Sequence, residues 1–386
     1  MSSNVSTEPP AGQAPDAATF AARRDRVRRS LAAAGAHAVV SGPGDDMAYL
    51  LGGHSVADER PCLLLTTTSG DALLVPRLAE EELRPLCADV RVRAWDDGDD
   101  VLAALRALLA ETHAPAGADL IVDPTLRADA LLLLQAALPS GRTRLQPALV
   151  AQARAVKDAS ELERLTAAAE LADAAVAYAW EAARAGMRER ELSALVRAFH
   201  ERHGATQAFA GVSFGANSAL PHHTPGDARL APGTLILLDT GSRLHGYQGD
   251  VTRMAWFGPT PPPRAVGELV AHVEAAVTAA YAAARPGATG GEVDAAARAA
   301  LVAAGLGERF VHRTGHGIGL SVHEAPYLAP GSRDVLEVGA AFTIEPGAYL
   351  PGLHGVRLED TVVMTSEGPV ALTRVPRALA HLPGSA

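Results

Sequence analysis

The chain has 386 residues, of which 48% are hydrophobic and 20% are charged, and its formal net charge is -10. This composition is typical of a globular chain long enough for two domains. The negative charge excludes non-specific binding to nucleic acid, because that binding needs a basic face.

The first 18 residues are rich in Ser, Pro and Ala and contain no apolar run. They predict a disordered tail rather than a signal peptide. Two cysteines, Cys62 and Cys87, are too few for a disulfide framework of the secreted kind. The most apolar run, 130–138, is too short to cross a bilayer. We therefore expect a cytoplasmic protein that has no membrane partner.

Residues 19–153 predict an N-terminal α/β domain, because helical spacing and short apolar runs alternate there. The expected helices are 20–34, 100–111 and 127–137. The expected strands are 38–40, 62–65, 72–75, 90–95 and 120–122. No metal-ligand cluster or phosphate-binding loop occurs in this sequence, and 42–45 is interpreted as a turn. A shape-giving or dimerising role is favoured for this domain.

The domain boundary is expected near 153–159, so that the second domain covers 154–386. Ser160 and Glu163 have the spacing of a capping box, with Ser160 as the N-cap residue. A long amphipathic helix is expected to follow, ending near Ala185.

A weak internal repeat runs through the second domain at a constant offset of 101 residues. The matched pairs are Arg184 and Arg285, Gly186 and Gly287, Glu191 and Glu292, and Arg197 and Arg298. Helices near 160–203 and 264–304 each precede a strand-rich stretch, near 206–257 and 309–364. Two similar α+β halves predict a pseudo-twofold domain with a site between them.

The run 235–238 is apolar and is bounded by Pro232-Gly233 and Gly241, which predicts a buried strand that ends in Asp239. Asp250 follows eleven residues later. A buried carboxylate costs several kcal/mol unless it is paired or binds a cation. Two such acids on neighbouring strands either point apart or hold a cation between them.

Three further residues, His316, Glu345 and Glu359, lie at apolar strand edges or in glycine-rich turns. Each alone is most simply a turn or loop residue. Together with Asp239 and Asp250 they form a set of four carboxylates and one imidazole. Such a set suits Mn²⁺, Co²⁺, Fe²⁺ or Zn²⁺ rather than a thiolate-type structural zinc site. Two divalent ions would balance the four carboxylates, and a metal pair about 3.5–4 Å apart can activate a bridging water.

Five short motifs carry these residues in order along the chain. They are Asp239-Thr240-Gly241, Asp250-Val251-Thr252-Arg253, Gly315-His316-Gly317-Ile318-Gly319, Glu345-Pro346-Gly347 and Val356-Arg357-Leu358-Glu359-Asp360. This series resembles the metal-site motifs of the pita-bread metallopeptidases, which include methionine aminopeptidase, aminopeptidase P and prolidase. The stretch 218–222 and the creatinase-like N-terminal domain point to the proline-specific branch. The likeness covers nearly the whole chain after residue 18.

The resemblance implies a creatinase-like α/β domain followed by an α+β pita-bread domain with pseudo-twofold halves. It also implies two divalent ions, with Mn²⁺ favoured over Co²⁺, Zn²⁺ and Fe²⁺. Asp239 would bind one ion, Asp250 and Glu359 would bridge both, and His316 and Glu345 would bind the other.

The resemblance implies roles for three further histidines, His222, His312 and His323, as active-site residues. His222 would contact the substrate and stabilise the transition state, although its neighbour His223 is an alternative. Glu345 would also act as the acid and base of the reaction. We expect Arg357 and the hydroxyl of Thr252 to contact ligand carboxylates, and Tyr247 is a further candidate for this supporting role.

The implied activity is hydrolysis of the peptide bond before proline, by an Xaa-Pro aminopeptidase or an Xaa-Pro dipeptidase. The implied partner is a small peptide with proline in the second position, and a homodimer is expected. One alternative is a metal-retaining hydrolase or lyase of non-peptide substrates, similar to ectoine hydrolase or a sulfonium lyase. The other is a binding module, although relatives of that type usually lose ligands that this chain keeps.

Overall fold

The computed structural model describes residues 17–54 and 57–383, and these residues divide into two compact units. The first unit extends to Arg154 and the second begins at Ala155. The predicted tail lies outside the described residues except for Ala17 and Ala18, which form the start of a helix, so the prediction is wrong for these two.

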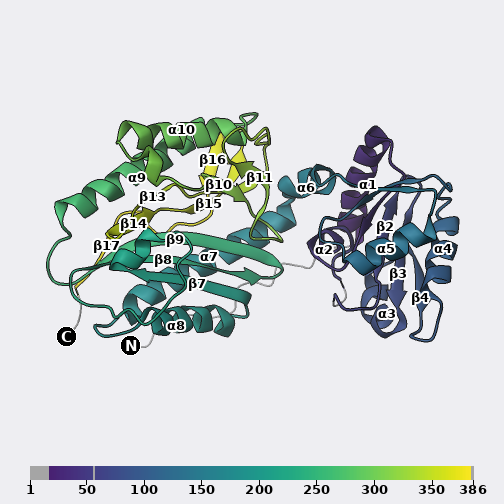
Figure 1. The fold of residues 1–386 in the computed structure, drawn as a ribbon, viewed down its shortest axis with the longest axis horizontal. Helices are drawn as coiled ribbons and strands as arrows, with labels where there is room; N and C mark the ends of the chain where they lie inside the picture. The colour runs from purple at the N-terminus through teal and green to yellow at the C-terminus, as the bar shows by residue number, and fades with distance from the viewer. Residues whose placement is uncertain (1–16, 55–56, 384–386) are drawn as a thin grey trace. The chain divides into compact units, whose positions relative to one another are not determined.

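The first unit is a six-stranded mixed sheet covered by helices (Figure 1). Its helices are α1 (Ala17–Ala34), α2 (Asp45–Leu51), α3 (Arg77–Leu83), α4 (Val101–Glu111), α5 (Ala128–Ala137) and α6 (Ala148–Ala155). Its strands are β1 (Ala38–Ser41), β2 (Leu63–Thr67), β3 (Asp71–Pro76), β4 (Val90–Trp95), β5 (Asp119–Val122) and β6 (Arg142–Leu145). The strand order is β4-β3-β2-β1-β5-β6, and β2 is antiparallel to both of its neighbours.

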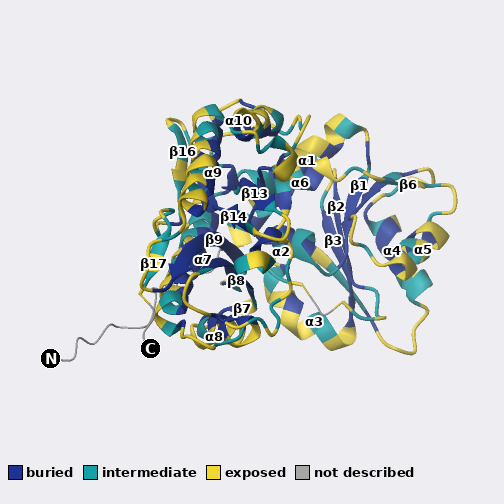
Figure 2. Cartoon of the chain, turned by 60° about the vertical axis from the view of Figure 1, so that its left-hand side comes forward, coloured by how far each residue is buried: buried dark blue, intermediate teal, exposed yellow. Residues whose placement is uncertain are grey.

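The central strands of this sheet are buried on both faces. Figure 2 shows β1, β2 and β3 in dark blue between α4 and α5 on one side and α1 and α2 on the other. Alternate residues such as Val40, Leu65 and Leu74 join Leu105 and Leu134 of α4 and α5 in one apolar cluster. Strands covered on both faces are nearly continuously apolar, which is why their sequence predicted them well.

The second unit holds two pairs of helices and two main sheets. Its helices are α7 (Ala159–Ala182), α8 (Glu189–Arg202), α9 (Arg264–Ala283) and α10 (Gly290–Ala303). One sheet has the order β17-β9-β8-β7, from β7 (Thr206–Phe214), β8 (Thr234–Leu244), β9 (Tyr247–Phe257) and β17 (Ala380–Leu382). The other has the order β11-β10-β12-β15-β16, from β10 (Gly315–Gly317), β11 (Glu324–Leu328), β12 (Ala341–Ile344), β15 (Asp360–Thr365) and β16 (Gly368–Ala371). A separate hairpin joins β13 (Gly347–Leu350) to β14 (His354–Arg357).

The predicted repeat is confirmed by the start and end of the helices. Helices α7 and α9 end at Ala182 and Ala283, and α8 and α10 begin at Glu189 and Gly290, so the offset of 101 residues is kept. The glycines before α8 and α10, Gly186 and Gly287, have φ of 82° and 85°. The second unit therefore consists of two similar α+β halves, as the resemblance implied.

The predicted capping box of α7 is wrong by two residues. The N-cap residue is Asp158, whose side chain accepts a hydrogen bond from the Glu161 N–H, while Glu161 accepts one from the Asp158 N–H. Ser160 instead donates its hydroxyl proton to Asp158. An ionised aspartate accepts the backbone N–H more strongly than a hydroxyl does, so Asp158 takes the capping position.

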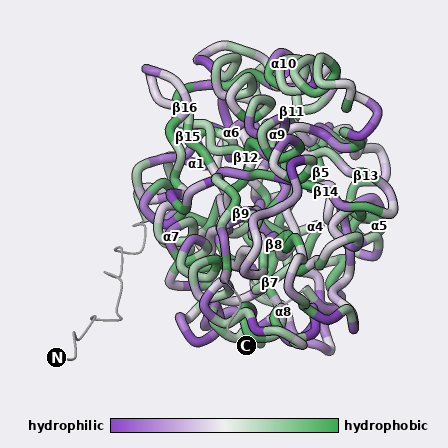
Figure 3. The backbone as a smooth tube through the Cα atoms, turned by 90° about the vertical axis from the view of Figure 1, so that its left-hand side faces the viewer, coloured by the Kyte–Doolittle hydropathy of each residue, from purple (hydrophilic) through white to green (hydrophobic). Residues whose placement is uncertain are grey.

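Hydrophobic and hydrophilic stretches alternate along the tube in Figure 3. Consistent with this alternation, none of the helices among the described residues is both long enough and apolar enough to span a membrane.

Candidate metal centre and active site

The hairpin of β8 and β9 places Asp239 and Asp250 on one face. Asp239 lies opposite Thr252, and Gly241 lies opposite Asp250, so the two acids are diagonal neighbours on the same side of the ladder. The prediction that Asp239 ends its strand is wrong. Gly241 pairs within the ladder, and β8 continues to Leu244 before a two-residue turn at His245 and Gly246. Both turn residues have positive φ, 50° and 85°, as a tight hairpin turn requires.

His316 occupies the middle of the short strand β10, between two glycines. A Cβ atom on Gly315 would overlap the carbonyl of Thr343 in β12, and one on Gly317 would overlap the carbonyl of Ala325 in β11. The glycines therefore allow β10 to pack closely between its two neighbours. His316 is fixed in the middle of this packed sheet.

Glu345 and Glu359 lie at the same end of one strand pair. Ile344 of β12 pairs with Asp360 of β15, so Glu345 directly follows one strand and Glu359 directly precedes the other. The Glu359 N–H also donates to the Thr252 carbonyl at 3.2 Å, which joins this end of the second sheet to β9.

All eight predicted site residues line one cavity of about 690 Å³ within the second unit. They are Asp239, Asp250, His316, Glu345, Glu359, His222, His312 and His323. The ligating atoms of Asp250, His316 and Glu359 all lie within 4.8 Å of one another. His316 Nε2 lies 3.2 Å from Glu345 Oε1 and 3.9 Å from Asp250 Oδ2. The structure thus brings residues from both halves of the repeat to one place.

The pKa values of the four carboxyl groups in this cavity are shifted from their usual range. Burial, together with the negative charge of Glu359, raises the pKa of Asp250 well above its usual range. Burial and the charge of Glu345 do the same to the pKa of Glu359, and burial raises the pKa of Asp239. Burial also acts to raise the pKa of Glu345, but the hydrogen bond to His316 and its charge outweigh this and bring the pKa to about 2. Mutual repulsion of this kind is relieved when a cation binds between the carboxylates.

Two further features fit a divalent cation. Asp250 Oδ1 is buried and accepts no hydrogen bond within the described part of the chain. His316 Nδ1 lies 3.0 Å from the Gly317 carbonyl, and Nε2 faces the carboxylates, so Nε2 is the nitrogen that would bind a cation. Carboxylate oxygens with one imidazole nitrogen form a donor set suited to divalent ions such as Mn²⁺, Zn²⁺ or Co²⁺.

Arg357 and Thr252 contact carboxylates of the cavity as predicted, whereas Tyr247 does not. Arg357 donates to Asp239 Oδ2 at 2.5 Å, and the Thr252 hydroxyl donates to Glu359 Oε2 at 2.7 Å. Tyr247 does not support the cavity: its hydroxyl donates to Glu161 of α7 at 3.0 Å. Its proximity to Asp250 in sequence was misleading, because Tyr247 lies at the hairpin turn and an odd number of residues from Asp250, on the opposite face of β9.

The structure separates the two candidate histidines His222 and His223. His222 lines the cavity, whereas His223 Nε2 lies 2.8 Å from the fully buried carboxylate of Glu189. Glu189 also accepts hydrogen bonds from Asn217 and from the N–H groups of Phe214 and Gly226. Glu189 and His223 therefore hold the loop from which His222 reaches the cavity.

Burial favours the neutral form of two histidines of the second half, His312 and His323. Burial lowers the pKa of His312, and burial followed by the charge of His316 lowers the pKa of His323 to about 4. His312 Nε2 lies 2.8 Å from the Tyr349 hydroxyl, and Arg357 donates a hydrogen bond to that hydroxyl. His222 and His323 both line the cavity, and their rings make no hydrogen bond with the described residues.

Models of known families match both units of this chain. The metallopeptidase family M24 matches residues 163–366, and the creatinase/prolidase N-terminal domain matches residues 23–156. The chain belongs to metallopeptidase family M24. Membership implies a divalent metal, for which the cavity provides a candidate site.

Similar proteins extend over nearly the full length of this M24 chain. The "probable dipeptidase PepE" of Mycobacterium tuberculosis is 36% identical over 377 residues, which cover 96% of this chain and 98% of that protein. The crystal structure of dipeptidase PepE from Mycobacterium ulcerans has a TM-score of 0.88 at 35% identity and covers 96% of this chain and 99% of that one. The Xaa-Pro dipeptidase from Bacillus anthracis has a TM-score of 0.86 at 30% identity, with coverage of 94% and 100%.

Several residues that line the cavity of this M24 chain were not anticipated from the sequence. Phe209, Pro221 and Val322 provide apolar wall, and Arg313 adds a cation whose guanidinium lies 4.9 Å from the ring centre of Tyr327. Arg313 follows His312 directly, which could have indicated its position. No signal in the sequence identified Phe209, because its place depends on the pairing of β7 with β8.

Proposed function

We propose that this chain is a metal-dependent peptidase that cleaves the peptide bond before proline, with an Xaa-Pro dipeptide as its substrate. The observation that carries the proposal is the meeting of four carboxylates and four histidines on one cavity of an M24 chain. The names of its relatives, which include dipeptidases and an Xaa-Pro dipeptidase, support the dipeptide over a longer peptide.

In this proposal five residues would hold two divalent ions, with Mn²⁺ favoured. Asp239 would bind one ion, Asp250 and Glu359 would bridge both, and His316 and Glu345 would bind the other. The buried, unpartnered Oδ1 atom of Asp250 supports its place in this set. When bound, such ions lower the pKa of a water molecule and polarise the scissile carbonyl.

The protein's own groups would move and hold the protons of the reaction. Burial acts to raise the pKa of Glu345, but hydrogen bonding to His316 lowers it and favours the ionised form. This carboxylate would take a proton from water and pass it to the leaving nitrogen. The leaving group is a secondary amine, which must be protonated as the C–N bond breaks.

The histidines would bind the substrate around that bond. An imidazole N–H can donate a hydrogen bond to the developing oxyanion, and His222 would serve in this way. His323, whose pKa is about 4, is neutral near pH 7, and the same applies to His312. Phe209, Pro221 and Val322 would provide the apolar wall for the pyrrolidine ring.

The test is a substrate panel assayed with Mn²⁺. The enzyme is expected to hydrolyse Ala-Pro faster than Ala-Pro-Ala by at least roughly 10-fold, a difference of about 1.4 kcal/mol, and to leave Ala-Ala nearly untouched. Faster cleavage of Ala-Pro-Ala would assign an aminopeptidase. Failure to cleave any proline peptide would favour the second candidate, a metal-dependent hydrolase or lyase of non-peptide substrates.

The predicted homodimer and cytoplasmic location complete the proposal. The chain has only two cysteines and both are buried, which supports a reducing compartment. Light scattering of the purified chain tests the dimer.

A further inference from the structure

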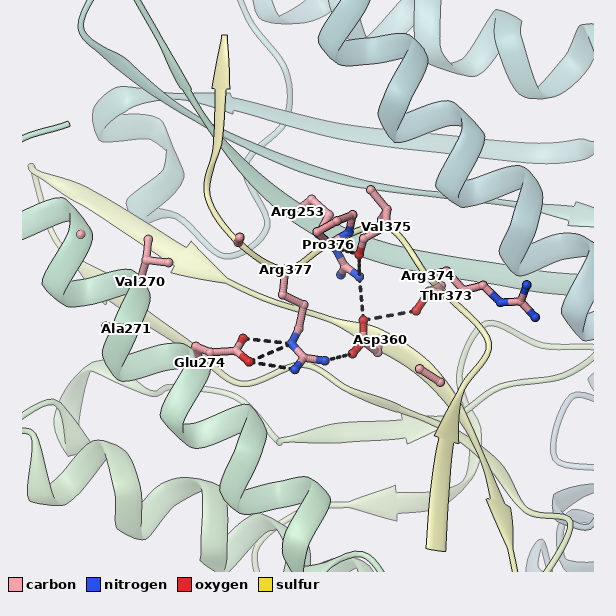
Figure 4. Close-up of a pocket in the computed structure, with 13 residues that line it drawn as sticks. Arg253, Val270, Ala271, Glu274, Asp360, Thr373, Arg374, Val375, Pro376 and Arg377 are labelled. Atoms are coloured by element: carbon pink, nitrogen blue, oxygen red, sulfur yellow. Dashed lines mark hydrogen bonds and ion pairs between the residues drawn. The ribbon is translucent and has the colours of Figure 1, made fainter. Parts of the chain in front are cut away.

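A second cavity of about 560 Å³ lies in the second unit, between α9 and the segment 371–378 (Figure 4). Its charged wall includes Arg253 and Asp360, whose side chains are each only 2% exposed. Arg253 directly follows Thr252, and Asp360 directly follows Glu359. The pair therefore lies immediately next to the residues that support and form the candidate metal centre, although neither residue lines the metal cavity.

The guanidinium of Arg253 uses all five of its N–H donors. Nη1 donates to the backbone carbonyls of Thr252, at 3.0 Å, and Glu359. Nη2 donates to Asp360 Oδ1 at 2.7 Å and to the Val375 carbonyl at 2.6 Å. Nε donates to the same Val375 carbonyl at 2.9 Å. One planar group thus ties β9, the start of β15 and the C-terminal segment together.

Each carboxylate oxygen of Asp360 also accepts two hydrogen bonds. One oxygen accepts from Arg253 and from the Thr373 hydroxyl at 3.3 Å, and the other accepts from the Tyr281 hydroxyl at 2.9 Å and from Arg377. Arg377 in turn pairs with Glu274 of α9 at 2.8 Å, toward the outer part of the cavity (Figure 4). Because Arg253 and Asp360 have no free hydrogen-bonding capacity, they are suited to bracing the backbone rather than to binding a ligand.

The hydrogen bonds of Arg253 join the two chain segments that carry the mutually repelling carboxylates of Asp250 and Glu359. Asp250 belongs to β9, and Glu359 directly precedes β15 of the second sheet. The Thr252 hydroxyl holds the Glu359 carboxylate, and the Thr361 hydroxyl donates to the Asp250 carbonyl at 2.8 Å. Arg253 adds the direct link between the Thr252 and Glu359 carbonyls, so it fixes the separation of the two acids against their repulsion.

We propose that Arg253 is a positioning residue that sets the metal affinity of the site by holding Glu359 against β9. The inference rests on the proposed function, because it assumes that Asp250 and Glu359 bind metal. Replacing a residue that holds a metal ligand in position typically lowers metal affinity by roughly 10–100-fold. Lysine cannot replace Arg253, since its three donors do not span the four acceptors that the planar group reaches.

The experiment titrates Mn²⁺ into metal-free wild type and Arg253→Lys by calorimetry, with circular dichroism to verify folding. Arg253→Lys is expected to weaken Mn²⁺ binding at least about tenfold. The matched control is Glu274→Gln, which alters the outer end of the same network and should bind Mn²⁺ within about twofold of wild type.

If Arg253→Lys does not fold, Asp360→Asn carries the test, with weakening of about tenfold expected. Folded variants that bind Mn²⁺ as tightly as wild type, even with a lowered melting temperature, would reduce Arg253 to a structural residue and overturn the inference. Absence of Mn²⁺ binding by wild type would instead contradict the proposed function.

Discussion

Asp250 and Glu359 are the residues on which the proposed chemistry depends most. Each is buried, and the pKa of each is raised by burial and by the neighbouring carboxylates. Asp250→Asn or Glu359→Gln is therefore expected to abolish peptidase activity and to lower the number of bound metal ions, because each would remove a bridging ligand. Activity assays and metal analysis measure both effects, and full turnover in either variant would rule out the assignment.

His222 is proposed to act in the reaction rather than to bind metal. His222→Ala should bind as much Mn²⁺ as wild type but have a kcat lower by roughly 10²-fold, since an oxyanion donor is lost. His245→Ala, at the exposed hairpin turn, is the matched control and should have normal kcat. An unchanged kcat in His222→Ala would return the role to His223 or remove it.

His200 of α8 links stability to pH at a site away from the chemistry. Its ring lies 3.0 Å from the Thr240 hydroxyl and 2.8 Å from the Ser242 hydroxyl, and burial lowers its pKa to about 4. The unfolded chain takes up this proton below about pH 6.5, whereas the folded chain does not. The stabilising effect of neutral His200 is therefore complete above pH 6.5 and is lost as the pH falls toward 4.

The expected loss is roughly 2 kcal/mol between pH 7.5 and pH 5. Urea unfolding of wild type and His200→Gln at both pH values measures it, because glutamine removes the titration. The exposed His203→Gln serves as the control. Equal losses of stability in wild type and His200→Gln would disprove the link.

At the scale of single elements, the cap of α7 gives a direct comparison of two neighbouring residues. Asp158→Ala should lower the free energy of unfolding by about 1 kcal/mol, because the Glu161 N–H loses its acceptor. Ser160→Ala should cost less than about 0.5 kcal/mol, since its hydroxyl only supports Asp158. Denaturant unfolding distinguishes them, and a larger effect for Ser160 would favour the cap first predicted from the sequence.

The elements that the sequence predicted well are those whose pattern is local. The apolar strands of the first unit and the helix from Asp100 were close to their observed bounds, because burial on both faces and a capping aspartate leave clear signals. Helices α2, α3 and α6 and strand β6 were missed, since each is short and β6 lies at a partly exposed sheet edge. Gly241 was interpreted as the end of a strand although its pairing with β9 keeps it inside.

Five of the cavity residues were predictable from residue types and position, and the histidines His222, His312 and His323 from the family resemblance, but the contacts that support them were not. Five of the eight predicted side chains lie in short motifs that can be recognised in the sequence. All eight line one cavity. The contacts of Arg253 with Val375 and Glu359, and of His223 with Glu189, join residues far apart in the chain. Only the folded arrangement of strands and loops reveals such partners.

At the scale of the whole chain, the second unit is a duplicated α+β arrangement whose halves contribute different residues to the candidate metal site. Asp239 and Asp250 come from the first half, and His316, Glu345 and Glu359 come from the second. A bound cation would therefore join the two halves. Ions that bind the folded state alone also raise its stability, so chelation should lower the melting temperature of the chain.

The most direct measurement is the Mn²⁺ content of the purified chain, together with its melting temperature before and after chelation. The account predicts about two Mn²⁺ ions per chain, a fall in melting temperature when they are removed, and recovery when they are returned. A chain that binds no divalent ion, and whose melting temperature does not respond to Mn²⁺, would contradict the account.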